Sequence, residues 1–167
     1  YGLVGSEMCI RDSCSTIQSV VPLKILQDAY GLKRVAYTTY QAVSGSGIKG
    51  KRDLSEGPNG KAPEAYPHPI YNNVLPHIDV FLENGYTKEE QKMIDETRKI
   101  LNDKDLKVTA TCVRVPVQDS HSIEIDVTLD KEANVKDIQN LFDQDSRVVL
   151  VDNPENNEYP LAIHSIG

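Results

Sequence analysis

The sequence has few cysteines, no net positive charge and no long apolar run, and each absence excludes a class of protein. Its three cysteines are odd in number and have no paired spacing, so they make a poor disulfide framework and favour a reducing cytoplasm. The net charge of -7 argues against a nucleic-acid partner, because polyphosphate backbones attract basic surfaces. No apolar run approaches the roughly 18 residues that a membrane-spanning helix needs, so no membrane partner is expected.

What is present is ordinary for a globular domain. The chain has 167 residues, of which 39% are hydrophobic and 26% charged, enough for one domain with a sizeable core. Residues 1–13 (YGLVGSEMCIRDS) have no period, and we expect them to be a non-native leader that includes Cys9. The folded domain is expected at 14–167. It ends at HSIG without a closing helix or charged tail, which suggests truncation at the C-terminus.

Two helices stand out in the hydrophobic pattern. Residues 14–30 present a broad apolar face, Ser15 or Thr16 can cap the start, and Gly31 stands where a C-terminal glycine belongs, although Pro22 should kink the helix. Residues 87–101 begin with a capping box, since Glu90 follows Thr87 by three positions. A shorter helix is expected at 134–142.

Strands are expected where apolar and polar residues alternate or β-branched residues gather, namely at 33–40, 108–117, 121–129 and 147–151. The residues QDS suit a hairpin between the second and third of these strands. The glycine-rich stretch 41–53 reads as a mobile loop, 52–69 as irregular, and 72–85 as an extended, partly buried connector. The order predicts an α/β (α+β) domain with a mixed, largely antiparallel sheet and helices packed on one face.

Three residues are candidates for catalysis or substrate binding. Cys14 stands at a helix start, where free amides and the helix dipole favour a thiolate, although a small buried core residue is the alternative. His121 opens a strand and can shuttle protons near neutral pH. Arg114 can grip a carboxylate with two parallel hydrogen bonds, and both residues can instead be plain surface groups.

Other polar residues have a simpler interpretation. Glu89 and Lys92 share a helix face and suit either an ion pair or opposite charges facing a zwitterionic ligand. Cys112 is read as core, and the histidines show no metal-ligand spacing. The glycines of SGSGIKG are not expected between a strand and a helix, so they are not read as a dinucleotide fingerprint.

Four segments together resemble one family. CSTIQSVVPLKILQDAYGLKRVAYTTYQAVSGSG resembles the catalytic-cysteine segment of aspartate-semialdehyde dehydrogenases. YTKEEQKMIDETRKIL, VTATCVRVPV and the following HS resemble three later segments in the same order. The resemblance covers about residues 14–165. It implies a catalytic domain like the C-terminal one of glyceraldehyde-3-phosphate dehydrogenase.

The resemblance also implies a role for each matching residue. Cys14 would be the nucleophile and His121 the acid/base, while Gln41 would hold the substrate or thioester. Arg114 would bind the substrate α-carboxylate. The substrate ammonium and phosphate would meet Glu89 and Lys92 respectively. Ser44 and Gly45 are possible cofactor contacts.

The implied reaction is the NADPH-dependent reductive dephosphorylation of aspartyl phosphate to aspartate semialdehyde through a cysteine thioester, with NADP(H) as cofactor. It feeds the biosynthesis of lysine, threonine, methionine and diaminopimelate. A cytoplasmic homodimer or homotetramer is implied. The family has Asn where Ser13 stands, and an N-terminal NADP-binding domain that is absent here, so the fragment alone is expected to be inactive. Two alternatives stay open, an N-acetylglutamyl-phosphate reductase and a non-catalytic dimerisation module.

Overall fold

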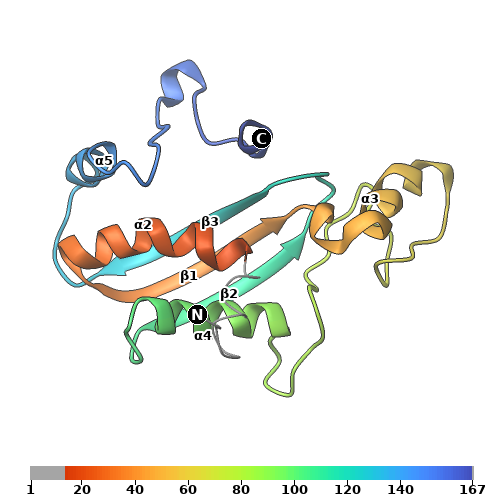
Figure 1. The fold of residues 1–167 in the computed structure, drawn as a ribbon, viewed down its shortest axis with the longest axis horizontal. Helices are drawn as coiled ribbons and strands as arrows, with labels where there is room; N and C mark the ends of the chain where they lie inside the picture. Colours follow the sequence, from red (N-terminus) through yellow and green to blue (C-terminus); the bar gives the residue numbers. More distant parts are fainter. Residues whose placement is uncertain (1–13, 167) are drawn as a thin grey trace, which may run out of the picture. The chain divides into compact units, whose positions relative to one another are not determined.

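The structure, a computed structural model, describes residues 14–166, and the expected leader with Cys9 and Ser13 lies outside them. Figure 1 shows the elements in chain order by colour. They are α2 (Cys14–Tyr30), β1 (Leu32–Gln41), η1 (Val43–Ser46), α3 (Gly47–Glu56), η2 (Gly57–Asn59), α4 (Lys88–Ile100), β2 (Lys107–Arg114), β3 (His121–Leu129), α5 (Val135–Asp143), η3 (Pro154–Asn156) and η4 (Ala162–Ser165), where η marks a 3-10 helix.

The described residues form two compact units. The first holds 14–37, 92–110 and 125–160, and the second holds 38–91, 111–124 and 161–166. The three strands form one sheet in the order β2-β1-β3, and each strand contributes residues to both units. Within the range 14–166, no helix is long and apolar enough to cross a membrane.

β1 and β2 run parallel. In the second unit, the Val115 amide donates to the Gln41 carbonyl at 3.0 Å. Further along both chains, the Val43 amide donates to the Val117 carbonyl at 2.9 Å. Because the residue numbers rise together on the two sides, this is parallel pairing, and the arrows of β1 and β2 point the same way in Figure 1.

β3 runs antiparallel to β1 on the other side. In the first unit, the Asp130 amide donates to the Gly31 carbonyl and the Lys131 amide to the Tyr30 carbonyl, so the numbers rise on one side and fall on the other. The expected mixed sheet is confirmed. The expected hairpin between β2 and β3 is wrong, because β1 lies between these two strands.

α2 covers the predicted residues from Cys14 to Tyr30. Ser15 and Thr16 do not cap it, because they lie inside its first turn and are buried. Gly31 ends the helix as expected, with φ at +72° and its amide donating to the Gln27 carbonyl at 2.9 Å. A Cβ on Gly31 would also lie 2.4 Å from Oδ2 of Asp130, the residue just after β3, so a side chain here would displace that carboxylate.

The expected capping box at the start of α4 is confirmed. The Thr87 amide donates to Glu90 Oε2 at 2.7 Å, and the Glu90 amide donates to Thr87 Oγ1 at 3.3 Å. Glu90 Oε1 accepts a further bond at 3.0 Å from the Cys112 amide, so one carboxylate joins α4 to β2. Cys112 is fully buried, which confirms its place in the core, and burial raises the pKa of its thiol to about 12.

Changing Glu90 to Ala should therefore destabilise the fold. The substitution leaves the Thr87 and Cys112 amides without their acceptor in a buried place, which should lower the free energy of unfolding by about 2–4 kcal/mol. Urea denaturation measures this change. Glu83→Ala is the control, because Glu83 is exposed and its loss should stay within about 0.5 kcal/mol. A loss below about 1 kcal/mol in Glu90→Ala would contradict the assignment.

We expect the buried hydroxyl of Tyr37, in β1, to make the fold less stable at alkaline pH. Its hydroxyl bonds Thr97 Oγ1 of α4 at 2.9 Å, and burial raises its pKa from 10.0 to about 12. Because the folded pKa lies above the unfolded one, the unfolded chain loses this proton first, and the free energy of unfolding falls as pH rises. Between pH 10 and 12 this group should contribute a fall of about 1 kcal/mol per pH unit. Urea denaturation of Tyr37→Phe should lack that contribution, and an identical pH slope in both proteins would contradict it.

The glycine-rich segment after β1 is ordered, so the mobile loop expected at 41–53 is wrong. The amides of Val43 and Ser44 donate to the carbonyls of Val117 and Gln118, and the segment forms η1 and α3. A Cβ on Gly50 would lie 2.6 Å from the Val43 carbonyl oxygen. The glycine content thus serves close packing of α3 rather than mobility. The stretch expected to be irregular from residue 52 becomes so only after α3 and η2 end.

The strand expected at 147–151 is also wrong. A turn occupies this position, in which the Asp145 carboxylate accepts from the backbone amide and the guanidinium of Arg147. These bonds lower the pKa of Asp145 to about 2. Val149 is 87% exposed, so the apolar run here has no partner strand among the described residues. The preceding helix α5 is confirmed, with Asn134 capping it through the Asp137 amide.

Candidate active site

Ala42, directly after β1, brings Arg114 and His121 together. Its carbonyl accepts a bond from Arg114 Nη1 at 2.7 Å, and its amide donates to His121 Nδ1 at 3.0 Å. The topology explains this meeting, because parallel β2 ends, and antiparallel β3 begins, at the same edge where β1 ends. Two residues that the sequence singled out separately therefore share one backbone anchor in the second unit.

Arg114 is a buried cation without a carboxylate partner among the residues described. It is 6% exposed, and its backbone amide and carbonyl both bond Leu75, at 2.8 and 2.9 Å. Apart from the bond to Ala42, its guanidinium has no hydrogen-bond acceptor among the described residues, and its Nε is buried without a hydrogen-bond partner. A buried charge is costly unless it is paired, so this arrangement suits an anionic group that arrives with a ligand.

Gln41 and Glu89 place an amide and a carboxylate in the same unit. Gln41 is 3% exposed, and its Nε2 donates to Thr39 Oγ1 at 3.2 Å and to Glu89 Oε1 at 3.4 Å. Glu89 is half-buried in the first turn of α4. A carboxylate held beside an amide in this way can meet a cationic group of a ligand.

His121 has its ring orientation set by the backbone. Because Nδ1 accepts the Ala42 amide hydrogen, the neutral imidazole carries its proton on Nε2, the nitrogen through which it can exchange a proton. Ser120, just before it, has φ at +72°, a left-handed conformation that is strained for a residue other than glycine. The chain thus enters β3 with a sharp turn that sets the direction of His121.

Cys14 and Lys92 belong to the first unit. Cys14 is exposed at the first residue of α2, with its Sγ 4.0 Å from Ser15 Oγ, so it is not the core residue that was the alternative. Lys92 is half-buried in α4, three residues after Glu89. The approach of Cys14 to Arg114 and His121 stays a prediction.

The glycine motif lies between a strand and a helix after all, which corrects the sequence expectation. Gly45 lies in η1 after β1, Gly47 opens α3, and Gly50 lies in the first turn of α3. A Cβ on Gly45 would lie 3.2 Å from Arg114 Nη1, and one on Gly50 would lie 2.7 Å from Tyr66 Oη. The close approaches at these two glycines are therefore made by the chain's own atoms, not left for a pyrophosphate as in a dinucleotide fingerprint.

Two residues that help to build the site, Ala42 and Tyr66, could not be identified from the sequence. Ala42 acts through its backbone, so its side-chain type is uninformative, and Tyr66, whose ring centroid lies 6.0 Å from Arg114 Cζ, stands in a proline-rich stretch without periodicity. His77 packs by stacking on Phe81, with ring centroids 4.4 Å apart. In the described range, no group of three or more His, Cys, Asp or Glu residues has the geometry to hold a metal ion.

Comparisons with known proteins agree on one family. The family model described as "Semialdehyde dehydrogenase, dimerisation domain" matches residues 23–167. The aspartate-semialdehyde dehydrogenase of Aquifex aeolicus is 48% identical over 162 residues, which cover 93% of this chain and 48% of that protein. That of Campylobacter jejuni is 45% identical, covering 90% of this chain and 46% of the relative. The chain thus spans about half the length of these curated relatives.

Solved structures give the same result. The crystal structure of Vibrio cholerae aspartate semialdehyde dehydrogenase II complexed with ASA matches with a TM-score of 0.84 and 37% identity, over 92% of this chain and 46% of that one. The Candida albicans enzyme with NADP matches with a TM-score of 0.57 and 28% identity, over 78% and 34%. The expected fold, like the catalytic domain of glyceraldehyde-3-phosphate dehydrogenase, is confirmed by these neighbours. The chain belongs to the semialdehyde dehydrogenase family, and the family model it matches is that of the dimerisation domain.

Proposed function

We propose that this chain carries the catalytic and dimerisation half of an aspartate-semialdehyde dehydrogenase, which reduces L-aspartyl 4-phosphate to L-aspartate 4-semialdehyde and releases phosphate. One observation carries the proposal: the backbone of Ala42 bonds both His121 and Arg114, a buried arginine that has no carboxylate partner among the described residues. The relatives named above, one of them bound to ASA, support the choice of substrate.

The substrate is an amino acid, and the charges of the site match it. The guanidinium of Arg114 supplies parallel donors for the α-carboxylate, and Glu89 supplies the counter-charge for the α-ammonium. Lys92 would bind the phosphate as a compact cation. The nearby Gln41 amide would hold the acyl oxygen or the thioester.

Cys14 would open the reaction. Its thiolate attacks the acyl carbon of aspartyl phosphate, the carbon–oxygen bond to phosphate breaks, and a thioester joins Cys14 to the substrate. After reduction, the carbon–sulfur bond breaks, the aldehyde leaves, and the electron pair returns to Cys14 sulfur. His121 moves the proton that these steps require through Nε2, since Nδ1 is engaged by Ala42.

NADPH, when bound, supplies the hydride that reduces the thioester carbon. Ser44 and Gly45 would contact the cofactor, because they follow Gln41 closely and Gly45 is exposed. The Gly50 hollow is occupied by Tyr66, so we propose that a separate nucleotide-binding domain, outside residues 14–167, holds the rest of the cofactor.

The assembled protein is proposed to be a cytoplasmic homodimer or homotetramer. The matched family model is a dimerisation domain, and alternate residues of β1, among them Arg34 and Tyr40, are exposed on the sheet face opposite the buried Tyr37. An exposed sheet face of this kind suits burial against a second copy of the chain. The expected non-native leader at 1–13 stays a proposal.

The substrate can be tested directly. The complete enzyme, with its nucleotide-binding domain, should reduce aspartyl phosphate with a kcat/KM at least about 10³-fold above that for N-acetylglutamyl phosphate, since Glu89 needs a cationic partner that an acetylated amine lacks. NADPH oxidation measures both rates. Residues 1–167 alone should show no turnover. Equal use of both acyl phosphates, or robust turnover by the isolated chain, would overturn the proposal.

A further inference from the structure

Tyr66 is the side chain that shapes the surroundings of Arg114. The Arg114 Cζ lies 6.0 Å from its ring centroid, within the range of a cation–π contact. A Cβ on Gly45 would lie 3.2 Å from Arg114 Nη1, so the guanidinium also borders the η1 backbone. A backbone acceptor, a close glycine backbone and an aromatic ring thus restrain this long side chain.

The ring of Tyr66 is fixed in turn by apolar packing. It packs against the buried cluster of Val43, Ile70 and Leu75. Its Oη reaches the hollow left by Gly50, where a Cβ would lie 2.7 Å away, and it is buried there without a hydrogen-bond partner. The ring rather than the hydroxyl therefore carries the contact with the rest of the unit.

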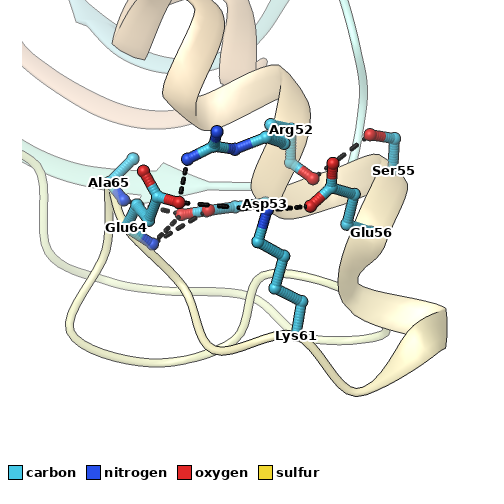
Figure 2. Close-up of polar contacts among 7 residues, drawn as sticks. All are labelled: Arg52, Asp53, Ser55, Glu56, Lys61, Glu64 and Ala65. Carbon is cyan, nitrogen blue, oxygen red and sulfur yellow. Dashed lines mark hydrogen bonds and ion pairs between the residues drawn. The ribbon is translucent and has the colours of Figure 1, made fainter.

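A buried carboxylate fixes the backbone just before Tyr66, as Figure 2 shows. Asp53 of α3 is 8% exposed and accepts from the Glu64 amide at 2.9 and 3.0 Å and from the Ala65 amide at 2.7 Å. We call these contacts the Asp53 clasp. Arg52 pairs with the Glu64 carboxylate and Lys61 with Glu56 on the more exposed side. Since charge-assisted bonds to backbone amides are strong, the clasp sets where Tyr66 begins.

We propose that Tyr66, seated by the Asp53 clasp, is a positioning residue that holds the Arg114 guanidinium ready for the substrate carboxylate. The inference rests on the proposed role of Arg114. A carboxylate partner would orient the guanidinium equally well, but it would compete with the substrate for the same donors. An aromatic ring restrains the guanidinium and leaves its charge and its in-plane donors available.

The test compares variants of the complete enzyme in the reverse direction, with aspartate semialdehyde, phosphate and NADP. Tyr66→Leu should raise the KM for aspartate semialdehyde about tenfold, while kcat and the KM for phosphate stay within about twofold. Tyr66→Phe keeps the ring and should retain the parent KM. Asp53→Ala should also raise the semialdehyde KM, because it removes the acceptor of both the Glu64 and the Ala65 amides.

Two variants of residues close to Gly57 serve as controls. Tyr71→Leu removes a half-exposed tyrosine that packs beside Gly57, and Glu56→Gln breaks the exposed pair with Lys61 without touching the Asp53 clasp. Both should keep the parent KM values. A Tyr66→Leu enzyme that behaves like Tyr71→Leu, or a Tyr66→Phe enzyme that loses substrate affinity as Tyr66→Leu does, would overturn the inference.

The Arg114→Lys background separates this inference from the proposed function. If Tyr66 acts through Arg114, adding Tyr66→Leu to Arg114→Lys should change the semialdehyde KM little further, whereas independent effects would multiply and contradict the inference. If Arg114→Lys itself leaves the semialdehyde KM unchanged, the assigned role of Arg114 fails, and with it the inference. If Arg114→Lys raises the semialdehyde KM as expected but Tyr66→Leu leaves it unchanged, the further inference is contradicted and the assigned role of Arg114 stands.

Discussion

Changing Cys14 to Ser is expected to lower the kcat of the complete enzyme by about 10⁴-fold or more. A thiolate is nucleophilic at neutral pH and leaves readily from a thiohemiacetal, whereas an alcohol is far less acidic and would leave poorly. Cys14 stands exposed at the first residue of α2, where the amides of the first turn and the helix dipole favour a negative charge on sulfur. Steady-state NADPH oxidation with aspartyl phosphate measures the loss, and single-turnover mixing should show no burst of phosphate release.

Cys112 is the matched control. It is fully buried, its pKa is raised to about 12, and it should stay protonated and unreactive at neutral pH. Iodoacetamide should therefore label Cys14 and spare Cys112, and in the complete enzyme labelling of Cys14 should abolish activity. Cys112→Ala should retain its kcat while losing stability through the cavity it leaves. An active Cys14→Ser enzyme would favour the non-catalytic dimerisation module instead.

The parts of the fold that the sequence predicts well are those fixed by near neighbours. The pair Thr87 and Glu90 needs only one helical turn to form a capping box, and Gly31 needs only the end of α2. The strand His121–Leu129 alternates with period two and has the predicted bounds. In each case, the residues that determine the local structure lie within a few positions of one another in the sequence.

What the sequence does not predict depends on distant partners. The hairpin expectation fails because β1, some 80 residues away in the chain, lies between β2 and β3. The apolar residues at 147–151 have the composition of a strand but no neighbour to pair with among the described residues. The glycines after β1 have the composition of a mobile loop, yet two of them make room for Arg114 and Tyr66.

The candidate site divides in the same way. Arg114 and His121 can be selected by residue type and family resemblance, but their meeting at Ala42 follows from the strand order, which no local pattern reveals. Gln41 was selected by resemblance alone, and its contact with Glu89 joins segments 48 positions apart. Cys14 is selected with equal clarity, and its distance to these residues stays a prediction.

The second large effect is expected at Arg114. Changing Arg114 to Lys should lower kcat/KM for aspartate semialdehyde by about 10²–10³-fold, mainly through KM. Lysine keeps the charge but loses the planar fork that bonds a carboxylate with two parallel donors, and it cannot reach Ala42 and the substrate in the same geometry. Two charge-assisted hydrogen bonds at about 1.5–3 kcal/mol each account for a loss of this size. Initial rates in the reverse direction measure it.

Arg147→Lys supplies the control, because Arg147 is an exposed arginine whose partner is Asp145 in a turn. Its kcat/KM should stay within about twofold of the parent. Arg114→Ala should lose more activity than Arg114→Lys, and added guanidinium ion should restore part of it, since the vacated space would readmit a planar cation between Ala42 and Tyr66. If Arg114→Lys binds the semialdehyde as tightly as the parent, the buried guanidinium serves the fold rather than the substrate, and the carboxylate must be bound elsewhere.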